Sequence, residues 1–133
     1  MARFIDTNVF VSGIFWKGAP HKVLEAWMQG RFKLIICPSI LTEYWRVVDG
    51  LMLQYPGLDA STIMELVNIK SEMVTPIAFV RPICTDPDDD KFLGAAVAAK
   101  APYVVTGDKA LLKVGIYNDV HVVTPAQFLR VLK

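Results

Sequence analysis

Short apolar runs alternate with segments of helical spacing along the whole chain. The runs have few polar interruptions, which is typical of strands covered on both faces. They predict five strands, placed at Phe4–Ile5, Leu34–Cys37, within Val74–Ile83, at Tyr103–Val105 and at Val120–Val123. In the third of these, Pro76 and Pro82 limit the length of the strand.

Between these runs apolar residues recur at helical spacing, and Pro or Gly marks most starts and ends. The predicted helices run from Pro20 to Gly30, Pro38 to Leu51, Asp59 to Met73, Lys109 to Val114 and Pro125 to Leu132, and a further helix follows the polar loop at residues 86–90 and continues through Ala101. The apolar stretch Val9–Ile14 fits either a helical turn or a loop. Strands that alternate with helices in this way predict an α/β domain with a mostly parallel central sheet.

The size and composition fit one folded domain over residues 1–133. Apolar residue types make up 53% of the chain and charged ones 20%, a composition that excludes intrinsic disorder. The net charge of +1 gives no large basic field of the kind that marks many nucleic-acid binders. The isolated Cys37 and Cys84 indicate a reducing cytoplasm, and we expect no secretion signal and no membrane helix.

An acidic residue follows each of the first four predicted strands. After the second strand, this residue lies about one turn into the next helix. Asp6 follows the first strand, Glu43 lies in the helix after the second, and Asp108 follows the fourth. The run Asp86–Asp90 follows the third strand. In a parallel sheet these positions share one edge, where ligands bind. Carboxylates held together there need a positive partner, and hard cations such as Mg²⁺ or Mn²⁺ prefer carboxylate oxygens.

Each acid also has a purely structural interpretation. Asp6 suits a turn, while Asp90 and Asp108 suit helix N-caps. Glu43 has the spacing to pair with Arg46 on an exposed helix face. For Glu43 and Asp108 taken singly the structural role is favoured, and only the joint placement points to a metal site.

Helix phase selects one residue of the acidic run. Asp90 precedes Leu93 by three residues and Val97 by seven, so it extends the stripe expected to face the sheet. Asp88 ranks below it, as a residue for an indirect or second-metal contact.

These residues resemble those of PIN-domain nucleases, in order and spacing, over nearly the whole chain. The matching motifs are Phe4-Ile5-Asp6-Thr7-Asn8-Val9, Pro38-Ser39-Ile40-Leu41-Thr42-Glu43, Asp86-Pro87-Asp88-Asp89-Asp90-Lys91-Phe92-Leu93, Val105-Thr106-Gly107-Asp108-Lys109 and Val122-Val123-Thr124-Pro125. The likeness is strongest to the VapC-like subgroup, described as toxin components of prokaryotic toxin–antitoxin pairs. The region Asp49 to Val80 matches less well.

The resemblance implies a three-layer α/β/α sandwich with a mostly parallel sheet of about five strands. It also implies a Mg²⁺- or Mn²⁺-dependent ribonuclease that leaves 5′-phosphate and 3′-hydroxyl ends. The family's acids fall on Asp6, Glu43, Asp90 and Asp108, and its polar positions on Thr7, Asn8 and Thr106.

The expected mechanism assigns metal binding to Asp6, Asp90 and Asp108. Glu43 binds the metal through water or orients the attacking water, and Thr7 and Thr106 position carboxylates or waters. Three basic residues near the site are candidates for phosphate contacts, although solvated surface is the alternative for each: Lys91, Lys109 and Arg46.

Two other functions remain open at this point. A non-catalytic PIN-like scaffold or RNA-binding module would keep the fold without the chemistry. A receiver-like phosphotransfer domain needs a Lys after a late strand, and Val123-Thr124-Pro125 has none. Apolar helix residues beyond the needs of a core suggest a homodimer contact or a groove for an antitoxin protein: Trp27, Trp45, Leu51, Met52, Leu53 and Met64.

Overall fold

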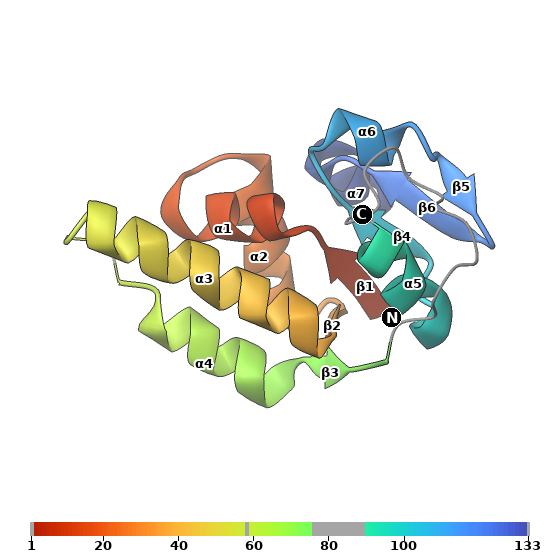
Figure 1. The fold of residues 1–133 in the computed structure, drawn as a ribbon. Coiled ribbons are helices and arrows are strands. Elements are labelled where there is room, and N and C mark those ends of the chain that lie inside the picture. Colours follow the sequence, from red (N-terminus) through yellow and green to blue (C-terminus); the bar gives the residue numbers. More distant parts are fainter. Residues whose placement is uncertain (1, 58, 76–89, 133) are drawn as a thin grey trace.

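The computed structural model describes residues 2–57, 59–75 and 90–132. One sheet crosses the molecule, with helices packed on both of its faces (Figure 1). Its strands are β1 (Ala2–Ile5), β2 (Lys33–Ile36), β3 (Glu72–Met73), β4 (Tyr103–Val105), β5 (Ile116–Tyr117) and β6 (Val120–Val123). The helices are α1 (Thr7–Phe15), α2 (Ala19–Met28), α3 (Pro38–Gln54), α4 (Ser61–Lys70), α5 (Asp90–Ala99), α6 (Lys109–Leu112) and α7 (Pro125–Val131).

The strand order is β3-β2-β1-β4-β6-β5, and every neighbouring pair is parallel except β5 with β6. In the middle of the sheet, Phe4 of β1 lies in register with Ile35 of β2 on one side and Val104 of β4 on the other. The carboxyl ends of these central strands therefore point to the same edge. This is the α/β architecture with a mostly parallel sheet that the sequence predicts.

Successive side chains of β1 point to opposite faces of the sheet, so they contact different helical layers. The Phe4 ring packs edge-on against Phe92 of α5, with ring centroids 5.7 Å apart. Arg3 points to the opposite face, where its guanidinium meets the ring of Phe128 in α7. Because both faces are covered, the central strands are largely apolar, and Phe4, Ile35 and Val104 are completely buried.

A glycine lets α1 and α2 pack closely. A Cβ added to Gly13 would lie 2.7 Å from the carbonyl oxygen of Pro20 and 2.8 Å from the side chain of Leu24. The His21 ring nitrogen Nδ1 lies 2.9 Å from the Gly13 carbonyl oxygen and forms a second link between the two helices. The apolar stretch Val9–Ile14, for which helix and loop were both open, is helical.

The structure differs from the predicted elements in two places at the edges of the sheet. The helix expected to reach Met73 ends at Lys70, and the next strand is Glu72–Met73 rather than a segment after Val74. Residues 76–83 of that expected strand lie outside the described residues. A sixth strand, β5, forms a hairpin with β6, and the positive φ of Asn118 (47°) and Asp119 (66°) fits a tight two-residue turn.

Two of the apolar residues expected at an interface belong to the core instead. Trp27 is 2% exposed and Met64 is fully buried, because α2 and α4 turn these side chains inward. Leu53 is 84% exposed, while the side chains of Trp45 and Leu51 are half-buried. Among the residues described, no helix is both long and apolar enough to cross a membrane.

Candidate active site

Asp6 stands at the point where β1 ends and α1 begins. Its backbone N–H donates to the Val105 carbonyl at 2.9 Å, and its own carbonyl accepts from the Phe10 N–H at 3.0 Å. The residue thus closes the β1–β4 ladder and opens the helix, which holds its side chain at the sheet edge. That side chain is 7% exposed. The carboxylate accepts a 2.6 Å hydrogen bond from the Thr106 hydroxyl.

Burial is the main reason why the pKa of Asp6 lies above its ordinary value. The Thr106 hydroxyl and the backbone amide of Asn8 oppose this by stabilising the charged form. The nearby carboxylates of Glu43 and Asp108 raise the pKa further. Glu43 and Asp108, from separate parts of the chain, therefore act electrostatically on Asp6 at this edge.

Thr106 connects Asp6 to Asp108. It directly follows β4, is fully buried, and its N–H donates to the Val123 carbonyl at 2.9 Å. Its hydroxyl oxygen accepts from the Asp108 N–H at 3.0 Å while it donates to Asp6. One threonine therefore fixes the loop after β4 relative to the end of β1.

Asp108 caps the short helix α6. Its Oδ1 accepts from the Ala110 N–H at 2.9 Å, so the structural interpretation of this acid is correct. The cap uses one carboxylate oxygen and orients the other. Because Asp108 also acts electrostatically on Asp6, capping and membership of the acidic group coexist.

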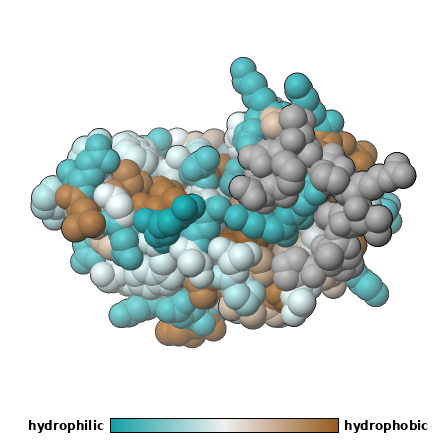
Figure 2. Space-filling model, in the orientation of Figure 1, coloured by the Kyte–Doolittle hydropathy of each residue, from teal (hydrophilic) through white to brown (hydrophobic). Residues whose placement is uncertain are grey.

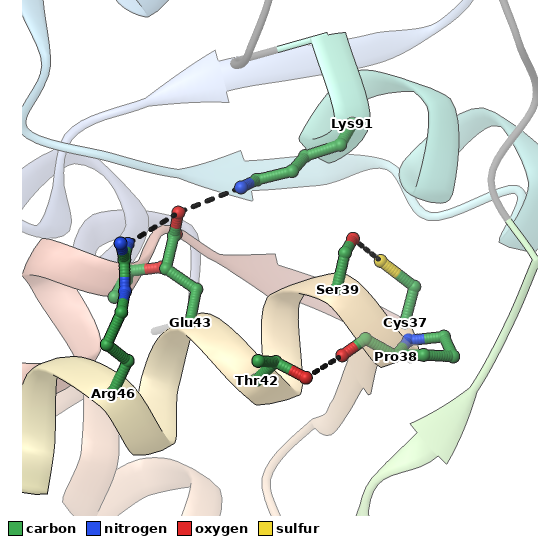
Figure 3. Close-up of polar contacts among 8 residues, drawn as sticks. Cys37, Pro38, Ser39, Thr42, Glu43, Arg46 and Lys91 are labelled. Carbon is green, nitrogen blue, oxygen red and sulfur yellow. Dashed lines mark hydrogen bonds and ion pairs between the residues drawn. The ribbon is translucent and has the colours of Figure 1, made fainter.

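Glu43 approaches the same edge from α3, where it lies in the second turn. Its Oε2 accepts a short hydrogen bond from the Thr7 hydroxyl, and its Oε1 accepts from Lys91 Nζ at 2.8 Å. Figure 3 shows Lys91 reaching across from α5 to Glu43, with Arg46 on the other side of the carboxylate. The Arg46 nitrogen is 3.9 Å from Oε1, and its side chain is 74% exposed.

The charge balance at Glu43 is opposite to that at Asp6. Burial acts to raise the pKa of Glu43, but the hydrogen bonds from Lys91 and Thr7 lower it. The positive charges of Lys91 and Arg46 act in the same direction, so the pKa lies below its ordinary value. Glu43 is a stable carboxylate at neutral pH, and Lys91 joins α5 to α3 through it.

Tyr44 supports the site, although nothing in the sequence marks it as a site residue. Its place in the apolar spacing of the helix is typical of an ordinary core residue. It is fully buried and its hydroxyl donates a short hydrogen bond to the Ile5 carbonyl, directly before Asp6. Its ring stacks on Phe10 of α1 with centroids 4.2 Å apart. Burial, and then the charges of Asp6 and Glu43, hold the pKa of Tyr44 well above its ordinary value. Tyr44 therefore acts as a neutral hydroxyl that fixes α3 against the end of β1.

Asp90 is the first residue of α5 and is half-buried. The next residue, Lys91, bonds to Glu43, which brings the first turn of α5 to the acidic edge. Leu93 of the predicted stripe is fully buried, whereas Val97 is half-buried, so the stripe faces the sheet most closely near its start. Asp88 lies outside the described residues.

The donor chemistry decides whether the site suits a divalent cation. Within residues 2–57, 59–75 and 90–132, no three His, Cys, Asp or Glu side chains form a group that could hold a metal ion. Glu43 has both oxygens bonded inside the chain. Asp6 and Asp108 offer hard oxygen donors, and the bonds to Asp6 from the described residues come from the neutral Thr106 hydroxyl and Asn8 amide. These two acids fit Mg²⁺ or Mn²⁺ as direct ligands, and Glu43 does not.

A cleft of about 520 Å³ opens beside Asp108. Asn8 and Ser12 of α1 line one wall, and Gly107, Thr124 and Pro125 line another. Lys109, the first residue of α6, is exposed next to Asp108. The cleft therefore opens the Asp108 side of the acidic edge to solvent, along the start of α1.

Comparison with known proteins gives this arrangement a family. The model of the PIN domain family matches residues 3–110, which include Asp6, Glu43, Asp90 and Asp108. The uncharacterized protein MJ1680 of Methanocaldococcus jannaschii is 31% identical over 140 aligned positions, covering 94% of this chain and 87% of that protein. No solved structure gave a significant match. The chain belongs to the PIN domain family.

PIN domains are generally nucleases that hydrolyse phosphodiester bonds, typically with divalent metals. Family membership therefore makes nucleic acid the substrate class of this protein. The acidic edge described above lies within the matched region, and its carboxylates are of the kind that such chemistry uses.

Proposed function

We propose that this protein is a Mg²⁺- or Mn²⁺-dependent endoribonuclease. The observation that carries the proposal is the buried carboxylate of Asp6, held by Thr106 among the charges of Glu43 and Asp108. A buried acid among other acids is unfavourable unless a cation joins it, and a PIN domain uses such a cation for cleavage.

We assign Asp6 and Asp108 to hold the ion directly, and Asp90, at the start of α5, to join them as a ligand once the ion is bound. When bound, the ion supplies positive charge to the phosphoryl oxygens and lowers the pKa of a water molecule. Thr106 keeps the Asp6 and Asp108 loops in register through its two hydrogen bonds. The Thr7 hydroxyl, at the start of α1, holds the Glu43 carboxylate in place through its hydrogen bond.

Glu43 orients the attacking water in this proposal. A carboxylate has about four lone-pair sites, so Glu43 can accept from water while it keeps its bonds to Thr7 and Lys91. Lys91 and Arg46 then serve two purposes, because they neutralise Glu43 and lie beside it where an RNA phosphate arrives. Lys109 and Asn8 flank the cleft from the Asp108 side.

The reaction is hydrolysis. A water oxygen bonds to phosphorus, the bond from phosphorus to the 3′ oxygen breaks, and that oxygen takes up a proton. The products are a 5′-phosphate and a 3′-hydroxyl. No redox partner or second substrate is needed.

The test is cleavage of single-stranded RNA with Mg²⁺ or Mn²⁺, with EDTA as control. We expect metal-dependent cleavage by the wild-type protein and none by Asp6→Asn. Asp59→Asn is the matched control, because Asp59 is an exposed acid whose hydrogen bond to the Ser61 N–H an Asn can keep. Equal cleavage by Asp6→Asn, or cleavage unaffected by EDTA, would refute the proposal. RNA binding without any cleavage would favour the RNA-binding module instead.

We extend the proposal to a toxin of a toxin–antitoxin pair, acting as a homodimer and neutralised by a protein partner. It is supported by a groove of about 470 Å³ between α2 and α4, apart from Asp6, Glu43 and Asp108, with Met28 (40% exposed) and Ile69 (79% exposed) in its lining. Growth arrest on induction of the wild type but not of Asp6→Asn is the expected result. Unimpaired growth with an active nuclease would assign the protein to housekeeping RNA processing.

A further inference from the structure

A second cavity lies away from the acids, where α1 and α3 both end. Its volume is about 590 Å³, and we call it the Trp16 pocket after the most prominent of its lining residues: Phe15, Trp16, Gln54, Tyr55, Pro56 and Gly57. Trp16 is 51% exposed and Tyr55 is 46% exposed. The pocket therefore presents aromatic faces to solvent.

These aromatic rings do not serve as core. Trp27, at 2% exposure, fills the interior next to Phe10, with ring centroids 6.5 Å apart. Trp16 instead follows the last residue of α1 in extended backbone conformation and forms an edge-to-face ring pair with its neighbour Phe15, at 5.9 Å and 73°. A large aromatic side chain left half in water is informative because burial would have been favourable.

The pocket is connected to the acidic site by both helices. In Figure 1, α1 lies alongside α3, and the two helices pack together. Helix α1 begins at Thr7, which bonds to Glu43, and reaches Phe15 after about 12 Å of helix rise. Helix α3 covers the distance from Glu43 to Gln54 in about 16 Å of rise.

One face of α3 runs from the acidic site to the Trp16 pocket. Glu43, Arg46, Gly50 and Gln54 are three or four residues apart in succession, so they share a helix face. Arg46 offers an exposed cation, and nothing lies within 4 Å of the Cβ position of Gly50. In Figure 2, hydrophobic side chains reach the surface over the end of α3, next to strongly hydrophilic ones.

The chemistry of the pocket fits an unpaired nucleobase. Aromatic faces stack on any base, and the Gln54 amide carries both donors and an acceptor for a base edge. The lining contains no carboxylate that would repel a phosphate, and Lys17, directly after Trp16, is exposed. A partner protein is less well matched, because the aliphatic groove at Met28 and Ile69 offers it a more apolar surface elsewhere.

We propose that the Trp16 pocket is a stacking subsite for unpaired bases of the RNA strand that reaches the acidic site. The inference rests on the proposed nuclease function and narrows its substrate to single-stranded RNA, since bases inside a duplex are not free to enter. The subsite holds the strand a few nucleotides from the bond that is cut.

The first test measures binding of a labelled oligoadenylate of about 12 nucleotides in EDTA, where no cleavage occurs. We expect Trp16→Ala and Tyr55→Ala to bind roughly 5- to 150-fold more weakly than wild type, and Trp16→Phe to retain most of the affinity. Ile116→Ala is the control, because Ile116 is 62% exposed on β5 and lies outside the pocket lining. An oligonucleotide of the same length with abasic positions keeps the phosphates and should bind wild type and Trp16→Ala equally.

Unchanged affinity of both alanine variants would overturn the subsite, as would equal binding of the abasic and intact strands by wild type. Unfolding curves check that the variants fold, and recovery with Trp16→Phe separates stacking from general disruption. Preferential, Trp16-dependent binding of a protein over the oligonucleotide would also overturn it.

The second test separates this proposal from the nuclease proposal. In cleavage of the same strand, Trp16→Ala should raise KM rather than lower kcat. If no variant cleaves RNA but binding still depends on Trp16, the subsite stands and the nuclease assignment fails. If cleavage is normal and Trp16→Ala changes neither Kd nor KM, the subsite fails alone.

Discussion

The central strand β1 has one buried charged residue near its start and another directly after its end. The surroundings of these two residues differ. Arg3, near the start, is fully buried, and Asp6, directly after the strand, is 7% exposed. Both lose the hydration that favours the charged form, so burial lowers the pKa of Arg3 and raises that of Asp6. What surrounds each charge then decides its role.

Arg3 lies against a pair of neighbouring aromatic rings. Its guanidinium carbon is 4.8 Å from the ring centre of Tyr103 and 5.6 Å from that of Phe128. A guanidinium is weakly hydrated and stacks well on aromatic faces, so this burial contributes to packing. At this end of the strand the charge has become part of the core.

Asp6 lies among other acids instead. Its bonded partner is the neutral hydroxyl of Thr106, and Glu43 and Asp108 act against its ionisation. Nearby, Glu43 has Lys91 to offset its charge. A buried charge packed on aromatic rings is part of the core, whereas a buried carboxylate near like charges is harder to ionise, and this is the basis of our proposal that Asp6 binds a cation.

The largest expected effect comes from removing the charge of Asp6. Asp6→Asn keeps an oxygen that can accept from Thr106 but loses the charge that we assign to metal binding. We expect metal-dependent RNA cleavage to fall at least about 100-fold. Initial rates at saturating Mn²⁺ measure this, and a loss of less than tenfold would place the essential charge elsewhere.

The second effect is on stability at the opposite end of β1. Arg3→Ala removes a fully buried side chain that lies against two rings, and should cost about 2–4 kcal/mol of unfolding free energy. Arg3→Met, which refills the volume, should recover most of that loss. Denaturant unfolding measures both, and cleavage per folded molecule should stay at the wild-type level. A loss of cleavage in folded Arg3→Met would remove the distinction between the two ends.

A smaller effect concerns the hydroxyl that positions Asp6. Thr106→Val removes the donor to Asp6 and the acceptor for the Asp108 N–H. We expect a roughly 10- to 100-fold loss in metal affinity or cleavage rate. Thr42→Val is the matched control, because the Thr42 hydroxyl bonds to the Pro38 carbonyl on an exposed face of α3 (Figure 3). Equal behaviour of the two variants would mean that Thr106 does not position the site.

The smallest effect is a pH dependence of stability in metal-free protein. The folded-state pKa of Asp6 is raised, so its contribution to stability is present at low pH and is lost as pH rises through that pKa. Asp6→Asn carries no such penalty and should be at least as stable as wild type at neutral pH. Denaturation in EDTA across the acid-to-neutral range measures the difference, which should shrink as pH falls. A difference that grows towards acid pH would contradict the raised pKa.

Local sequence patterns predict the central strands of the sheet, but they do not predict the strands at its two edges. The runs at Leu34–Cys37 and Tyr103–Val105 are apolar throughout because two helical layers cover them, and the structure has strands there. The two-residue strands β3 and β5 lie at opposite ends of the sheet and carry half-exposed, mixed residues. Their pairing depends on neighbouring strands rather than on their own sequence.

The candidate site shows the same division. The positions of four acids after strands predict that they share one edge, and the structure places Glu43 and Asp108 near enough to Asp6 to raise its pKa. The Lys91–Glu43 pair spans 48 positions and the Thr106–Asp6 bond spans 100, so no local pattern indicates them. Lys91, expected to contact phosphate, has a carboxylate as its partner in this structure.

Local hydrophobic patterns predict the α/β class, the parallel core and acids at the carboxyl ends of the strands, because alternating strands and helices can be recognised in short segments. Which of the charges are offset depends on contacts between distant residues, and so on the tertiary structure. A side chain's pKa and partners depend on burial and on residues far along the chain, as Arg3 and Asp6 demonstrate only three positions apart. The same is true of Trp16 and Trp27, which are the same residue type, one half in solvent and one in the core.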